Sequence, residues 1–211
     1  MQDNYIITIG RSIGAGGLTT AKLLGENLGI KVYDSDIIFE TAKQSGLNPE
    51  IFKKKDERIP KHRLTSLFGL RSLAHGNGSI TTDSIMNEEA LFEIGSKTIR
   101  QIAETESCII VGRCADYILR DNPRCVSIFI TATLEARTKR LMEKHGLTED
   151  VALRHIEQGD RRRSTYYNYY TFKKWGDSSS YDLCIDSSKL DNDLNKVVAT
   201  IKYYLQQRNI I

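Results

Sequence analysis

Residues 6–20 read Ile-Ile-Thr-Ile-Gly-Arg-Ser-Ile-Gly-Ala-Gly-Gly-Leu-Thr-Thr, an apolar run typical of a strand that breaks into glycines and then enters a helix-forming segment. Such a junction directs bare backbone N–H groups and the positive end of the helix dipole at one concave site, which suits a polyanion. Gly14, Gly16 and Gly17 supply positive φ angles and close backbone approach. The stretch therefore predicts a phosphate-binding loop, and a simple tight connection is the alternative.

One position of this loop departs from the common pattern of Gly, four residues and Gly-Lys-Ser/Thr, because Gly17 stands where the lysine is expected. A lysine at that position contacts the β- and γ-phosphates of a bound triphosphate. The loop is therefore predicted to bind phosphate mainly through its backbone.

Length and charge favour a single-domain soluble enzyme. At 211 residues the chain fits one domain with a substantial core. Charged residues make up 27% of the chain and the net charge is +3, too little for a dedicated nucleic-acid binder. The apolar stretches fall far short of the roughly 18 residues that a membrane span needs. The start Met-Gln-Asp-Asn-Tyr lacks the basic region of a signal peptide, so we expect a cytoplasmic protein with no membrane contact.

The cysteines and histidines show no metal-ligand spacing, so no structural metal is predicted. The cysteines are interpreted as buried, reduced thiols in or beside strands: Cys108, Cys114, Cys125 and Cys184. Cys114 follows a predicted strand end, and partial exposure near a ligand is its alternative.

Apolar strand-like runs alternate with helix-like segments along the whole chain, which indicates an α/β fold with a parallel sheet. The expected strands cover residues 5–10, 31–33, 108–112, 125–130 and 181–185. The expected helices cover residues 17–28, 83–105, 134–145, 148–169 and 191–207, with further helices after 34–36 and from 48 onward. A mobile loop is expected within residues 60–82.

Ligands of a parallel sheet bind beyond the carboxyl ends of its strands, so the residues there are the candidates for function. They are the loop 10–19, the acidic turn 34–36, the turn 112–114 and the segment after Ile130. Arg113 directly follows a buried strand, where a guanidinium needs a partner. A bidentate anion is one such partner, and a salt bridge to Asp34 or Asp116 is the alternative.

A second basic segment, Gly159-Asp160-Arg161-Arg162-Arg163, leads into a tyrosine cluster at residues 166–170. It is either a charged exposed turn or an element that folds over a nucleotide and stabilises a phosphoryl group in transfer. Arg137 and Arg140 on the preceding helix face the same choice. The tyrosines either pack the helix or stack on bases, and RNA binding through this segment is the least favoured interpretation.

The order of these motifs resembles that of the cytidylate kinase-like proteins. The resemblance rests on the Arg-Ser-x-Gly-Ala-Gly-Gly-x-Thr loop, the Tyr-Asp-Ser-Asp turn, the Val-Gly-Arg turn, Asp-x-Arg-Arg with Tyr-Tyr-Asn-Tyr-Tyr, and Tyr-Asp-Leu-Cys-Ile-Asp, and it covers nearly the whole chain. It implies a three-layer P-loop NTPase fold with a five-stranded parallel sheet. It further implies a core of about 1–34, 106–145 and 180–211, a helical monophosphate-binding insertion of about 35–105 and an arginine-bearing lid of about 146–179.

The resemblance also implies a role for individual positions. The ATP phosphates would be bound by Ser12, Gly14, Ala15, Gly16, Gly17, Leu18 and Thr19. Thr19 is the expected magnesium contact, since Leu18 occupies the usual hydroxyl position. Asp34, Asp36 and Arg113 would bind the acceptor nucleotide, whereas Cys114 replaces the aspartate of the family's Gly-Arg-Asp turn.

The implied activity is a transfer of the γ-phosphoryl group from ATP to a small acceptor, with CMP or dCMP as the first expectation. Magnesium, backbone amides and arginines would align and neutralise the phosphates, and the arginines expected to take part are Arg11, Arg137, Arg161 and Arg162. Losing the lysine costs roughly 10²–10³ in rate by analogy with oxyanion donors, so Arg11 or Arg162 is expected to replace its charge. The alternatives are a nucleotide-binding regulatory protein without phosphoryl transfer and a kinase for a non-nucleotide metabolite.

Overall fold

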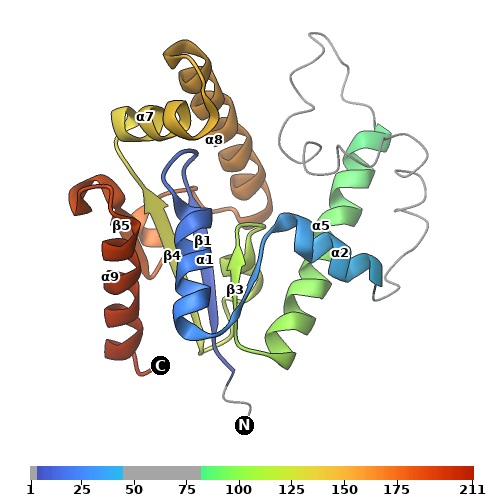
Figure 1. Cartoon of the computed structure of the whole chain (residues 1–211). Coiled ribbons are helices and arrows are strands. Elements are labelled where there is room, and N and C mark those ends of the chain that lie inside the picture. The colour runs from blue at the N-terminus through green and yellow to red at the C-terminus, as the bar shows by residue number, and fades with distance from the viewer. Residues whose placement is uncertain (1–3, 45–81) are drawn as a thin grey trace.

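The computed structural model describes residues 4–44 and 82–211. The helix expected from residue 48 and most of the loop expected within 60–82 lie outside these ranges. Five parallel strands form one sheet in the order β2-β3-β1-β4-β5 (Figure 1). Their bounds are Ile6–Arg11 for β1, Lys31–Tyr33 for β2, Cys108–Val111 for β3, Cys125–Thr131 for β4 and Leu183–Asp186 for β5. The predicted α/β class and five-stranded parallel sheet are confirmed.

The helices follow the predicted alternation closely. They are α1 (Gly17–Leu28), α2 (Ser35–Gln44), α5 (Thr82–Thr105), α6 (Ala115–Ile118), α7 (Leu134–His145), α8 (Glu149–Thr171) and α9 (Leu194–Gln207). Two short 3₁₀ helices, η3 (Ser178–Ser180) and η4 (Ser187–Leu190), flank β5.

The predicted starts of two elements were wrong by two or three residues, and one short helix was missed. The strand expected from residue 181 begins at Leu183, because η3 comes just before it. The last helix begins at Leu194 rather than at 191, because Asp191 and Asn192 have positive φ and Asp193 then caps the helix through its side chain. The short helix α6 was not predicted, since four residues carry too little periodicity to be recognised.

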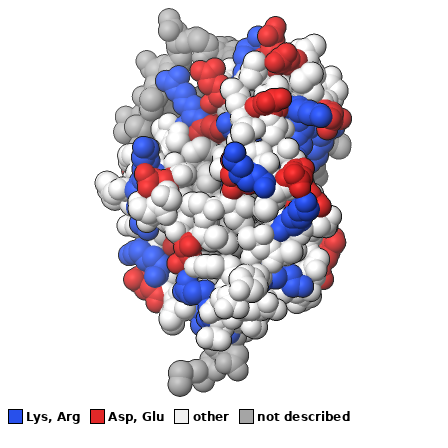
Figure 2. All heavy atoms as spheres, turned by 90° about the vertical axis from the view of Figure 1, so that its left-hand side faces the viewer, with Lys and Arg blue, Asp and Glu red and all other residues white. Residues whose placement is uncertain are grey.

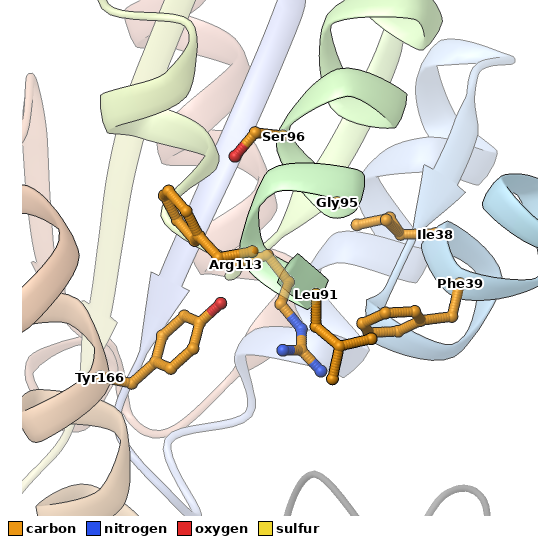
Figure 3. A pocket seen from close by; sticks show the side chains of 8 residues that line it. Ile38, Phe39, Leu91, Gly95, Ser96, Arg113 and Tyr166 are labelled. Carbon is orange, nitrogen blue, oxygen red and sulfur yellow. The ribbon is translucent and has the colours of Figure 1, made fainter. Parts of the chain in front are cut away.

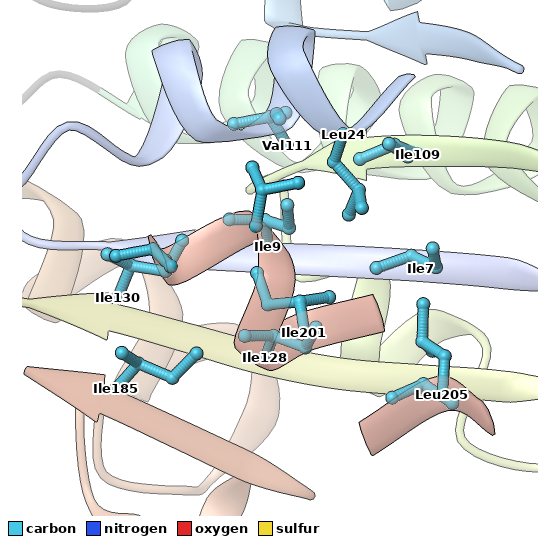
Figure 4. Packing of buried hydrophobic residues seen from close by; sticks show 14 of the residues in the cluster. Ile7, Ile9, Leu24, Ile109, Val111, Ile128, Ile130, Ile185, Ile201 and Leu205 are labelled. Carbon is cyan, nitrogen blue, oxygen red and sulfur yellow. The ribbon is translucent and has the colours of Figure 1, made fainter. Parts of the chain in front are cut away.

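The two faces of the sheet are buried by different helices, which makes three layers. On one face Ile7 and Ile9 of β1 pack with α1 and α9 through residues such as Leu24 and Ile201 (Figure 4). On the other face Ile6 packs with α5, α6 and the end of α8. Successive strand side chains point to opposite faces, so a strand covered on both sides has a continuous apolar sequence.

The register of the sheet brings three strand ends together. Ile9 pairs with Val111 of β3, and Arg11 pairs with Ile130 of β4. The turn after β3 and the loop after β1 therefore lie at the same edge of the sheet.

The cysteines have unequal surroundings, although none of the four forms a disulfide. Cys108 and Cys114 are buried, and burial raises the pKa of each thiol to about 12. The interpretation as buried thiols is confirmed for these two, so Cys114 is not the partly exposed thiol of the alternative. It was wrong for Cys184, which is exposed on the edge strand β5.

Two surface features bear on partners. Among residues 4–44 and 82–211, no helix combines the length and apolar character needed to cross a membrane. On the face drawn in Figure 2, basic and acidic side chains are interspersed rather than gathered by sign. Mixed charge of this kind suits a small substrate better than a long polyanion.

Candidate active site

The loop between β1 and α1 owes its shape to two glycines. Gly14 has φ +77° and Gly16 has φ +84°, a left-handed conformation that side chains with a Cβ rarely adopt. Both are also closely packed. A Cβ on Gly14 would lie 2.8 Å from the carbonyl oxygen of Arg137, and a Cβ on Gly16 would lie 2.8 Å from a methyl group of Leu194. Conformation and space therefore both require glycine.

Five backbone N–H groups of this loop make no hydrogen bond within the described part of the chain; they belong to Gly14, Gly16, Gly17, Leu18 and Thr19. Gly16 is the N-cap of α1 and offers no side-chain cap. The free N–H groups at the start of a helix, together with its dipole, form an anion-binding site. They match most of the positions predicted to hold phosphates.

Two predicted loop residues contribute differently. The N–H of Ser12 donates to Ile130 O (3.0 Å), and its hydroxyl lies 3.2 Å from that of Thr131. The N–H of Ala15 donates to Ser12 O (3.3 Å). Both residues support the loop from within.

Side chains of α7, α8 and η4 donate hydrogen bonds to the carbonyl oxygens of the loop. The donors are Arg140 Nη1 to Gly14 O (2.7 Å), Arg137 Nη1 to Ile13 O (3.3 Å), Arg163 Nη1 to Arg11 O (2.9 Å) and Ser187 Oγ to Ala15 O (3.4 Å). These contacts hold the loop while leaving its amides available.

Asp160 attaches α8, the helix expected to form the lid, to the loop. Its carboxylate accepts from Ile13 N (2.7 Å) and from Arg137 Nη1 (2.5 Å). The Arg137 and Asp160 side chains are only 14% and 22% exposed, so this ion pair is screened far less than a surface pair. Gly159 fits against Ile13, where a Cβ would lie 2.5 Å from Cγ1. Sequence reasoning assigned no role to Asp160, whose position beside a glycine in the arginine run was the available signal.

Arg11 extends from the loop toward the end of β3, where its guanidinium lies against Gly112. Burial and then repulsion by Arg163 and Arg113 lower the pKa of Arg11 to about 9, while Asp34 acts in the opposite direction. The group remains charged at neutral pH. Arg11, Arg113 and Arg163 thus form a cationic cluster near the end of β3.

The three consecutive arginines of α8 differ in exposure. Arg161 is exposed. Nη1 of Arg162 is buried and has no hydrogen-bond partner among the described residues. Burial lowers the pKa of Arg163 to about 10.

The turn after β3 directs Arg113 toward the second half of the site. Arg113 and Cys114 have φ values of 58° and 55°. Left-handed non-glycine residues cost of order 1–3 kcal/mol each and cluster at functional sites. The Arg113 guanidinium lies 4.9 Å from the ring centroid of Phe39 and 5.8 Å from that of Tyr166 (Figure 3).

A small cavity of about 10 Å³ lies beside Arg113, between α2, α5 and α8. It is lined by Ile38, Phe39, Leu91, Phe92, Gly95, Ser96, Arg113 and Tyr166 (Figure 3). The lining is apolar apart from the guanidinium and the hydroxyl groups of Ser96 and Tyr166. The Ser96 hydroxyl is buried and has no hydrogen-bond partner in the described part of the chain.

The acidic turn and the tyrosines are largely structural. Asp34 Oδ1 accepts from the N–H groups of Asp36 and Ile37 (3.1 Å each), so Asp34 caps α2. Burial, and then the charge of Asp34, raise the pKa of Asp36. Tyr170 stacks on Phe92 of α5 with ring centroids 4.0 Å apart. Of the two interpretations of the tyrosines, helix packing therefore describes Tyr170 and the buried Tyr167.

The parallel sheet, its glycine loop and the helices on both faces define a kinase fold of the P-loop type. A shikimate kinase from Bacteroides thetaiotaomicron has the same fold, with a TM-score of 0.53 and 16% sequence identity over 96% of this chain and 98% of that chain. The solved structure of an uncharacterized protein from Eubacterium ventriosum is more similar, with a TM-score of 0.72 and 31% identity over 96% of this chain and 99% of that one.

Residues 6–189 match the model of the cytidylate kinase-like family, and the chain belongs to that family. The cytidylate kinase of Methanocaldococcus jannaschii is 28% identical over 190 residues, 88% of this chain and 90% of that protein. The cytidylate kinase of Sulfurisphaera tokodaii is 26% identical over 211 aligned residues, 97% of this chain and 99% of that protein. Fold and family together support a kinase acting on a nucleotide or another small molecule.

Proposed function

We propose that the protein transfers the γ-phosphoryl group of ATP to a nucleoside monophosphate, with CMP or dCMP as the preferred acceptor. The observation that carries this proposal is the row of free amides at Gly14 and at residues 16–19, in a loop entered through Arg11, whose guanidinium has Arg113 as a charged neighbour. Nucleotide phosphates need such donors, and a structural turn does not.

The donor nucleotide would be bound at the loop. The amides take its phosphate oxygens, and Arg161 and Arg162 from α8 approach the phosphates from the lid. The Thr19 hydroxyl is the protein ligand that this site would offer to magnesium. The Thr19 side chain is exposed and its hydroxyl bonds to no described residue, whereas that of Thr20 donates to Gly16 O (3.1 Å). Thr19 would thus hold a magnesium ion whose other ligands are phosphate oxygens and water. The bound ion supplies charge neutralisation of the phosphates.

The acceptor would lie on the Arg113 side. Arg113 binds the acceptor phosphate as a planar fork, and the base enters between α2, α5 and α8. Because the cavity there is about 10 Å³, room for about one water, these helices must separate to admit a base. Asp34 and Asp36, at the start of α2, would bind the acceptor nucleoside. An acceptor phosphate oxygen then attacks the γ-phosphorus, the bond from phosphorus to the β–γ bridging oxygen breaks, and ADP leaves.

A coupled assay of ADP release across nucleoside monophosphates, with and without magnesium, tests the proposal. We expect magnesium-dependent ADP formation that requires an acceptor and is fastest with CMP or dCMP. ADP formation only with a non-nucleotide acceptor would replace the proposed substrate class. A cytoplasmic location is part of this proposal.

A second candidate is a protein that binds nucleotides for regulation without transferring phosphate. Gly17 and Leu18, which replace the lysine and the hydroxyl residue of the common loop, favour it. Such a protein would be stabilised against heat by ATP or ADP yet convert no ATP with any acceptor.

A further inference from the structure

The cation and a glycine of the phosphate loop have exchanged places in this sequence. The common pattern begins with a glycine, continues through four residues to a second glycine and then has the lysine. When Gly16 is the second glycine, the opening position is Arg11 and the lysine position is Gly17. The chain therefore carries its positive charge where the glycine normally is, and glycine where the charge normally is.

The structure gives a physical reason for this exchange. A Cβ on Gly17 would lie 2.5 Å from Cβ and 2.9 Å from Cγ of Arg11. Gly17 is the first residue of α1 and, unlike Gly14 and Gly16, does not have a positive φ. Its backbone conformation suits any residue. Space for the Arg11 side chain is what requires glycine at this position.

The Arg11 side chain extends from Gly17 of the glycine loop to Gly112 in the turn that carries Arg113. Nη1 is packed against Gly112, where a Cβ would overlap it, and Gly112 is followed directly by Arg113. The guanidinium makes no hydrogen bond or ion pair with any residue in the described ranges. Its charged neighbours are Arg163 and Arg113, which repel it, and Asp34, which attracts it. A half-buried cation in such surroundings is unfavourable unless an anion joins it.

We propose that Arg11 and Gly17 are one exchanged pair that performs the task of the P-loop lysine, with Arg11 binding the phosphate group in transfer. A guanidinium presents two parallel N–H donors, so Arg11 can bind an oxygen of the γ-phosphate and an oxygen of the acceptor phosphate together. This inference rests on the proposed function, and it selects Arg11 over Arg162 as the replacement for the lysine.

Four variants test the exchange: Arg11→Met, Arg11→Gly, Gly17→Lys and the double variant Arg11→Gly with Gly17→Lys. Arg11→Met keeps an unbranched side chain over Gly17 and removes only the charge. Arg162→Met is the matched control, because it removes the same charge from the competing arginine. Each variant is measured for affinity for a non-hydrolysable ATP analogue by calorimetry, for turnover with the best acceptor and for thermal midpoint.

We expect Arg11→Met to lose roughly 10²–10³ in turnover, with a thermal midpoint that is unchanged or higher because a repelled cation is removed. Arg162→Met should lose less turnover than Arg11→Met. Gly17→Lys loses activity and thermal stability because its side chain collides with Arg11. The double variant, which restores the common pattern, recovers at least about tenfold over Gly17→Lys, a coupling that two independent sites would not show.

The inference is overturned if Arg11→Met keeps wild-type turnover and wild-type affinity for the ATP analogue, or if the double variant is no better than Gly17→Lys. Failure of the proposed function gives a different result. If the wild-type protein turns over no acceptor, the proposed function fails, and the exchange is then judged on affinity for the ATP analogue alone, in which the same order of variants must appear.

Discussion

The two halves of the site are built in opposite ways. On the donor side, the loop 12–19 offers backbone amides, and side chains of α7, α8 and η4 hold its carbonyl oxygens. On the acceptor side, Arg113 lies among aromatic rings from α2 and α8, and the surrounding cavity is apolar. Under the proposed function, the donor half is a polar loop held by hydrogen bonds, and the acceptor half is a packed apolar region that has to open to admit an acceptor.

This difference explains how one fold can keep a donor and vary its acceptor. Phosphate groups are common to all nucleotides, and amides in a fixed turn recognise them without reference to the rest of the molecule. An acceptor is recognised by side chains, which sequence change alters freely. Changes on the two sides should therefore have distinct kinetic signatures.

The largest expected effect separates the two halves directly. Arg113→Met removes the guanidinium of the acceptor side and should lower kcat/KM for the acceptor about 10²–10³-fold. ADP affinity should stay at the wild-type value, because the loop amides are untouched. Steady-state kinetics with calorimetry of ADP binding measures both, and an equal loss of ADP affinity would contradict the division into two halves.

The next effect concerns the hydrogen bonds by which Asp160 attaches α8 to the loop between β1 and α1. Asp160→Ala removes the acceptor of the Ile13 N–H and of Arg137, and should lower the free energy of unfolding by about 2 kcal/mol. Asp160→Asn, which keeps an oxygen for the Ile13 N–H, should lose roughly half as much. Urea denaturation measures both values. Wild-type stability in both variants would mean that the hydrogen bonds of Asp160 do not stabilise the fold.

A smaller effect is expected in the acceptor cavity. Ser96→Ala removes a buried hydroxyl that has no hydrogen-bond partner among the described residues, so stability should be unchanged or slightly higher. If this hydroxyl bonds the acceptor base, the acceptor KM should rise several-fold, about 1 kcal/mol in binding. Steady-state kinetics with a thermal melt checks this prediction, and the outcome against it is an unchanged acceptor KM.

The smallest effect is a pH dependence of the donor side. A bound phosphate stabilises the charged guanidinium, so binding must raise the pKa of Arg11 above its value of about 9 in the free protein. Affinity for a non-hydrolysable ATP analogue should be steady near neutral pH and weaken as the pH rises above about 9, by at most about tenfold per pH unit. Arg11→Met should lack this dependence, and calorimetry of the two proteins across that range compares them. The same decline in both would assign the titration to another group.

The sequence predicts the donor side well because that side is local. A strand, a glycine turn and a helix start lie within residues 6–28, and their conformation follows from neighbouring residues. The capping of α2 is local in the same way, because Asp34 directly precedes this helix.

The parts that escaped prediction depend on contacts between distant segments. Asp160 bonds to a residue 147 positions earlier in the chain, and no local pattern indicates such a partner. The unpartnered hydroxyl of Ser96 is visible only once α5 has packed against its neighbours. Likewise, the sequence could suggest that Arg11 or Arg162 replaces the lysine, but only the packing of Arg11 over Gly17 distinguishes them.

A crystal structure with a non-hydrolysable ATP analogue and magnesium tests the central claim most directly. We predict that the amides of Gly14 and of residues 16–19 bind the phosphate oxygens and that the Arg11 guanidinium lies within hydrogen-bond distance of the γ-phosphate. An analogue bound elsewhere, or bound in the loop with Arg11 turned away from its phosphates, would contradict the account.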